Sequence, residues 1–150
     1  MKAIKKLIYN NLLNLTKSKI ENLKKDIDST ITSRNTDTKS SAGDKHETSR
    51  AKIQIEIDQL SKQLSILNKQ HQILLSININ KEYKKIEMGT LVITNIGAYF
   101  IGIGFGKISI DGKVYYAISL ASPIGKILKD KVVGDEFIFN SNNNKVVEIY

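Results

Sequence analysis

Residues 53–77 carry the pattern that most restricts how this chain of 150 residues folds. Residues that are apolar except for one His recur there at alternating intervals of four and three, a heptad period of 3.5 residues. They are Ile53, Ile57, Leu60, Leu64, Leu67, His71 and Leu74. No Gly or Pro interrupts residues 44–88. Such a stripe predicts a long helix that packs lengthwise against another helix.

The partner helix is predicted over residues 3–33, where two rows of residues repeat every seven positions. The rows are Leu13, Ile20 and Ile27, and Thr16, Leu23 and Thr30. The polar segment Arg34–Gly43 between the helices reads as a turn. Residues 1–80 therefore predict an antiparallel coiled-coil hairpin with its tip near residues 34–47. A rod of roughly 45 Å is too long to bury itself, so we expect it to project.

From Gly89 onward the pattern changes to the two-residue alternation of β-strands. Strands are predicted at Thr90–Ile96, Ala98–Phe105, Val114–Ala121, Glu136–Phe139 and Lys145–Ile149. Asp111-Gly112 and Asn142–Asn144 are predicted turns. Ser122 and Pro123 suit the start of one short helix. The fold class is thus α+β, with a small bent antiparallel sheet and one helix over residues 82–150.

Composition and charge exclude several kinds of function. The chain has no Cys and two His, which excludes thiolate chemistry and makes a histidine-rich metal cage improbable. Residues 1–80 carry a net charge of +6 and residues 81–150 a net charge of +2. The basic first half suits contact with nucleic acid or with an acidic protein surface. We expect no membrane segment and a cytoplasmic location.

Two other patterns invite a catalytic reading that their context disfavours. Gly102-Ile103-Gly104-Phe105-Gly106 resembles a nucleotide-binding loop, but it is followed by the strand-like Lys107–Ile110 instead of a helix. His71 lies on the heptad seam, where a polar residue usually sets the register of the helices. No sequence context marks a serine nucleophile.

The tetrapeptide Asp44-Lys45-His46-Glu47 has two compatible interpretations. Asp followed three residues later by Glu is a capping box, which would start the second helix. Two carboxylates one turn apart at the end of a projecting rod are also suitable ligands for a hard cation such as Mg²⁺. Such a pair would complete a metal site that belongs to another molecule.

The C-terminal half contains motifs of a known family. The segment Tyr116–Lys126, which includes Ser122-Pro123-Ile124-Gly125, and the turn Val133-Gly134-Asp135-Glu136 resemble the C-terminal domain of the bacterial Gre transcript-cleavage factors. Gly43–Glu47 is similar to the G-D-x-x-E tip of that family. The Gre architecture is an N-terminal coiled coil followed by an FKBP-like domain, so the resemblance covers essentially the whole chain.

The resemblance implies a transcription elongation factor that binds core RNA polymerase. We expect Ser122, Pro123 and Ile124 to lie at an exposed corner of the C-terminal half. Ser122, Pro123, Ile124 and Gly125 would contact the polymerase, and the coiled coil would enter its secondary channel. Asp44 and Glu47 would share a second Mg²⁺ with the polymerase active site, which then hydrolyses backtracked nascent RNA by two-metal chemistry. The chain would be an accessory factor, not an enzyme by itself, and would bind no cofactor stably. We expect a monomer.

The tip departs from the family where Thr48-Ser49-Arg50 follows Glu47, and Lys45 and Arg50 make it less acidic. A second hypothesis is therefore a Gre-like channel binder that inhibits or modulates transcription without cleavage. A third is a coiled-coil adaptor or nucleic-acid-binding module that uses the basic first half.

Overall fold

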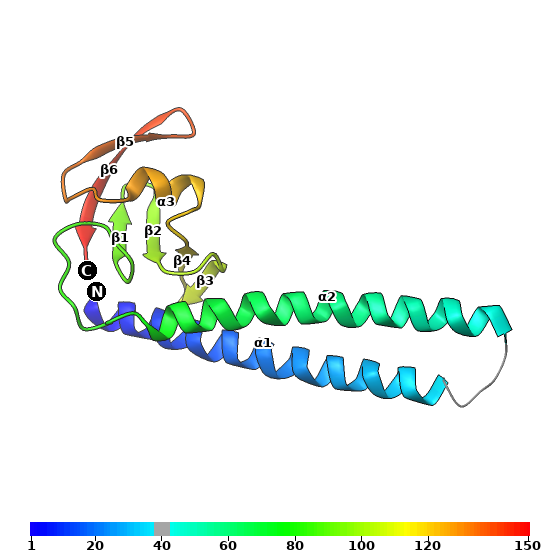
Figure 1. The fold of residues 1–150 in the computed structure, drawn as a ribbon. Helices are drawn as coiled ribbons and strands as arrows, with labels where there is room; N and C mark the ends of the chain where they lie inside the picture. The colour runs from blue at the N-terminus through cyan, green and yellow to red at the C-terminus, as the bar shows by residue number, and fades with distance from the viewer. Residues whose placement is uncertain (38–42) are drawn as a thin grey trace. The chain divides into compact units, whose positions relative to one another are not determined.

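The computed structural model describes residues 1–37 and 43–150, without the side chains of Asp37 and Asp44. In that part of the chain, two long helices precede a six-stranded sheet that carries one short helix (Figure 1). The chain divides into two compact units. Residues 14–71 form the helix-pair unit, and residues 1–13 together with 72–150 form the sheet unit.

The helix-pair unit consists of the facing parts of α1 (Lys2–Asp37) and α2 (Gly43–Leu75). Two contacts show that the helices run antiparallel. The Thr16 hydroxyl lies 2.7 Å from His71 Nδ1, and Arg34 Nη1 donates to Gln54 Oε1 at 2.8 Å. Every seam position predicted in residues 13–74 is buried or half-buried, whereas Ile55 and Ile66 beside the seam are exposed. The predicted heptad seam is confirmed, and His71 contributes to its register through Thr16.

The first part of the predicted turn is helical, which corrects the boundary at Arg34. Helix α1 continues to Asp37, and the hydroxyls of its threonines bond to carbonyl groups one turn earlier in the same helix. Thr32 Oγ1 donates to the Asp28 carbonyl at 2.9 Å, and Thr36 Oγ1 donates to the Thr32 carbonyl at 3.0 Å. Of the rest of the predicted turn, residues 38–42 lie outside the described residues, and Gly43 begins α2.

The sheet unit contains six strands in the spatial order β3-β4-β2-β1-β6-β5. Their bounds are Leu91–Thr94 (β1), Gly97–Ile101 (β2), Gly106–Ile110 (β3), Lys113–Ile118 (β4), Glu136–Phe139 (β5) and Asn142–Ile149 (β6). The short helix α3 spans Pro123–Leu128. The predicted fold class is confirmed: a long helix pair precedes a small, mostly antiparallel sheet with one short helix.

One pairing differs from the all-antiparallel prediction. Strands β2 and β4 are parallel, with Tyr99 opposite Tyr116. After β2 the chain crosses through Gly102–Phe105, forms β3 at the edge and returns as β4 between β3 and β2. Because β3 intervenes, β4 runs in the same direction as β2. The glycine-rich segment is thus a break between two strands, and in the structure it opens no helix.

The two predicted hairpin turns have different outcomes. Asp111 and Gly112 both have positive φ, 49° and 75°, and join β3 to β4 as predicted. The predicted turn at Asn142–Asn144 is wrong, because these residues begin β6. Asn140 and Ser141, with φ of 52° and 64°, make the turn, and Phe139 lies opposite Asn142.

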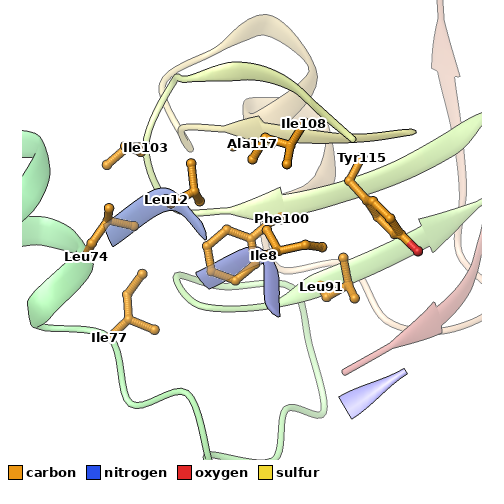
Figure 2. Close-up of a cluster of buried hydrophobic side chains, with 10 residues drawn as sticks. All are labelled: Ile8, Leu12, Leu74, Ile77, Leu91, Phe100, Ile103, Ile108, Tyr115 and Ala117. Atoms are coloured by element: carbon orange, nitrogen blue, oxygen red, sulfur yellow. The ribbon is translucent and has the colours of Figure 1, made fainter. Parts of the chain in front are cut away.

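The sheet buries apolar side chains on both faces. Neighbouring residues of a strand point to opposite faces, so Leu91 and Phe100 belong to one core and Val92 and Tyr99 to the other. The first core also takes Ile8 and Leu12 from α1 and Leu74 from α2 (Figure 2). The second core is completed by Ile124 and Leu128 of α3. The beginning of α1 and the end of α2 are therefore structural parts of the sheet unit.

Candidate functional site

The predicted metal-binding pair lies at the start of α2. Asp44 is the second residue of the helix, but its side chain is outside the described part of the structure. Glu47 is exposed, and its side chain has no hydrogen bond or ion pair with any described residue. Its carboxylate is thus accessible to solvent and to other molecules. Because α2 already begins at Gly43, Asp44 lies within the helix and not at its N-cap, which does not match the predicted capping box. The metal-binding role of Asp44 and Glu47 stays a prediction.

Basic side chains lie in the same part of the helix-pair unit as Glu47. Lys45, Thr48, Ser49 and Lys52 line a shallow depression along α2. Arg34 reaches Gln54, whose Nε2 donates to Asp58 Oδ1 at 2.9 Å. Among the described residues, no three His, Asp or Glu side chains lie close enough together to hold a metal. The shared Mg²⁺ therefore stays a prediction that needs ligands from a second molecule.

The predicted polymerase-binding segment forms the start of α3, and its geometry explains the Ser-Pro-Ile-Gly motif. Ser122 is the N-cap: its Oγ accepts a hydrogen bond from Gly125 N at 3.1 Å and donates to the Ser119 carbonyl at 2.7 Å. Pro123 occupies the first helical position, where no backbone donor is needed. A Cβ on Gly125 would lie 2.1 Å from the Ser119 carbonyl oxygen, so only glycine fits. The motif thus builds a rigid corner.

This corner is less exposed than the sequence predicts. Pro123 is exposed and Ser122 is half-buried, but Ile124 is only 8% exposed and packs in the core beneath α3. Gly125 is also buried. The expectation that Ile124 lies at an exposed corner is wrong, because alternate faces of a one-turn helix point to the core and to solvent. Within this segment, Pro123 and the half-buried Ser122 are the residues accessible to another protein.

Sequence reasoning missed two other surfaces of the sheet unit. Val133 and Ile138 are 56% and 67% exposed. Val133 lies within the turn in which Asp135 Oδ2 accepts from Val132 N at 2.9 Å, and Ile138 lies in β5 after that turn. A cleft of about 370 Å³ lies where α1 begins and is lined by Lys2, Lys5 and Lys6. The spacing of these lysines in the sequence places them near one another on a helix. The sequence does not show that residues 79–83 and the C-terminal residues Ile149 and Tyr150 form the rest of the cleft.

Comparisons with known proteins give one likeness. No protein-family model matches the sequence, and no curated protein matches it. Among solved structures, that of the transcription factor Gfh1 is similar over 92% of this chain and 92% of that chain, with 16% sequence identity and a TM-score of 0.36. At this identity and TM-score, the likeness assigns neither a family nor a function. In the described part of the chain, neither long helix has a stretch that is apolar enough to cross a lipid bilayer.

Proposed function

We propose that this protein is a Gre-like factor that binds RNA polymerase and assists the cleavage of backtracked RNA. The observation that supports the proposal best is an antiparallel helix pair whose turn end presents an exposed carboxylate, Glu47, without a partner among the described residues. The sequence resemblance to the Gre factors points to the same arrangement. A helix of 33 residues such as α2 is roughly 50 Å long, which suits a probe that reaches into a channel.

The proposed chemistry belongs to the polymerase, and this chain contributes oxygen ligands and their placement. Mg²⁺ prefers carboxylate oxygens and usually takes one or two from a protein. Asp44 and Glu47 would supply them, and a second Mg²⁺ shared with the polymerase would activate water for phosphodiester hydrolysis. The His71–Thr16 contact keeps the two helices in register, which would hold the carboxylates at a constant height along the pair.

The sheet unit would provide the docking surface. The capped start of α3 has a rigid backbone, because Ser122 satisfies the Gly125 N–H and Gly125 packs against Ser119 without room for a side chain. Pro123 would contact the polymerase directly. Ser122 and Gly125 would act by shaping the corner, and the exposed Val133 and Ile138 would extend the apolar contact area.

One observation favours a second candidate function, that of a channel binder that modulates transcription without cleavage. Lys45 and Lys52 lie along the same part of α2 as Glu47, and Arg50 follows closely. Positive side chains near a carboxylate repel a metal ion and lower the affinity of that carboxylate for it. The same cations could contact RNA or the acidic surroundings of a polymerase active site.

The test is the addition of the protein to stalled, backtracked elongation complexes, with RNA length as the readout. The double variant Asp44→Asn with Glu47→Gln keeps the hydrogen-bonding shape of both side chains but removes their charge. We expect it to bind polymerase normally and to lose RNA cleavage. The matched control is Glu56→Gln, an exposed carboxylate farther along α2.

Three other outcomes have distinct meanings. Cleavage by the double variant at the original rate would reject Asp44 and Glu47 as metal ligands. Binding without cleavage by the unmodified protein would select the modulator. No binding to core polymerase, together with salt-sensitive binding to free RNA or DNA, would select the nucleic-acid-binding module.

A further inference from the structure

Lys5 is a nearly buried lysine for which the proposed function has no use. The residue is 3% exposed, and its ammonium nitrogen lies 4.2 Å from the centre of the Tyr83 ring. Lys5 has no side-chain hydrogen bond or ion pair with any described residue. Burial, followed by the charge of Lys2, lowers the pKa of Lys5 to about 8. A buried cation that has only an aromatic ring for compensation is costly, which calls for an explanation.

Lys5 is one of the residues that line the cleft at the beginning of α1. This cleft has a volume of about 370 Å³, near the lower limit of typical small-molecule sites. Its walls combine lysines with the rings of Tyr83 and Tyr150 and the apolar side chains of Ile79 and Ile149. The Tyr83 hydroxyl donates to the Asn78 carbonyl at 3.3 Å, which helps to hold the ring beneath Lys5.

Positive charge at the cleft exceeds what the chain itself neutralises. Lys2 pairs with Glu82 at 2.6 Å and Lys81 pairs with Glu87 at 2.5 Å, but Lys5 and Lys6 have no carboxylate partner among the described residues. The first turn of α1 contains no acidic residue. The positive end of the helix dipole therefore adds to the lysine charges instead of being offset.

We propose that this cleft binds a small phosphomonoester, with the phosphate at Lys5 and Lys6 and an attached ring against Tyr83 and Ile149. A phosphate carries up to two negative charges and so matches two unpaired ammonium groups. Among the residues lining the cleft the basic ones are all lysines, which bind as point charges and lack the planar fork that arginine offers to carboxylates. The mixed apolar and aromatic walls fit a ring better than they fit a bare ion.

The proposal has a pH signature with a definite sign. A bound phosphate favours the charged form of Lys5, so the pKa of Lys5 rises on binding. By linkage, affinity falls as the pH rises through the free protein's value of about 8. The other titratable groups at the cleft are Lys2, Lys6, Lys81, Glu82, Tyr83 and Tyr150.

The experiment measures the binding of AMP, adenosine and inorganic phosphate to the full chain by calorimetry and by lysine-side-chain NMR at low salt. We expect saturable binding of AMP, weaker binding of phosphate and about tenfold weaker binding of adenosine. AMP should raise the pKa of Lys5. Lys5→Met should weaken AMP binding about tenfold, and the exposed Lys6→Gln, which disturbs no packing, should weaken it several-fold.

The matched control is Lys17→Met, an exposed lysine farther along the same helix, which should bind AMP as the unmodified protein does. The proposal is overturned if neither AMP nor phosphate binds at millimolar concentration, or if Lys6→Gln and Lys5→Met both bind AMP normally. Loss of polymerase binding in Lys5→Met, with no probe bound by the unmodified protein, would make the cleft a protein contact instead. The probes need no polymerase, so failure here is separable from failure of the proposed function.

Discussion

The fragment 82–150 carries every strand of the sheet and yet should fail to fold by itself. The isolated fragment lacks four side chains of the core shown in Figure 2, each at most 7% exposed in the full chain: Ile8, Leu12, Leu74 and Ile77. Fully burying a Leu or Ile side chain contributes about 1.5–3 kcal/mol, so the four together contribute about 6–12 kcal/mol. A domain of this size has a net stability of only about 5–15 kcal/mol.

The assay is urea denaturation monitored by circular dichroism. The dispersion of NMR chemical shifts checks that each protein is folded before urea is added. We expect no cooperative transition for fragment 82–150. A shortened chain that keeps residues 1–13 and 72–150, joined by a Gly-Ser linker in place of the helix-pair unit, should unfold cooperatively. It retains both helix ends that cover the sheet.

A pair of point variants tests the same reasoning in the intact chain. Leu12→Ala removes a fully buried side chain and should lower the free energy of unfolding by about 2–5 kcal/mol. Leu7→Ala, on the same helix but 47% exposed, should cost less than about 1 kcal/mol. A cooperative transition of fragment 82–150 at the urea midpoint of the shortened chain would refute the assignment of the helix ends to the sheet core.

Two further predictions concern single residues of the sheet unit. Gly125→Ala should destabilise the protein by about 1–3 kcal/mol or more, because the new Cβ would lie 2.1 Å from the Ser119 carbonyl oxygen. Gly104→Ala should be tolerated, because its Cβ would lie 4.0 Å from Ser119 Oγ, an ordinary contact distance. Equal urea midpoints for the two variants would contradict this. Because the pKa of Lys5 in the folded protein lies below that of an unfolded lysine, the unfolded state binds more protons between about pH 8 and 10.5. Stability should rise with pH across that window relative to Lys5→Met, and a pH-independent difference would show that Lys5 is not desolvated.

Local patterns were sufficient to predict several elements, because their physical causes are local. The heptad spacing around Ile57 and Leu64 requires one buried stripe, and the structure buries it. Asp111-Gly112 predicts its turn because both residues tolerate positive φ. Ser122 and Pro123 predict a helix start, and the cap forms through the Gly125 N–H. The predicted metal ligands Asp44 and Glu47 depend on a second molecule, so the sequence and this chain's fold leave their role as a prediction.

The remaining features depend on which residues and strands pair with one another, and the local pattern leaves several choices open. Five consecutive polar residues, Asn140–Asn144, contain several possible turns. The pairing of Phe139 with Asn142 selects Asn140 and Ser141, and Asn144 Nδ2 then bonds the Asn142 carbonyl at 2.8 Å. Alternation along a strand shows which residues share a face but not which strand is the neighbour, so the parallel β2–β4 pair was not predictable.

Burial of particular side chains was likewise a tertiary outcome. Three lysines in the first six residues read as a solvated helix start, and nothing local distinguishes Lys5 from Lys6. Lys5 is buried because Tyr83, far away in the sequence, packs against it. The sequence by itself determined the periodicities, the helix cap and one hairpin turn, since each depends on residues within one or two turns of chain. Only the tertiary structure decided the strand neighbours, the burial of Ile124 and the cleft at Lys5, since each depends on which distant segments meet.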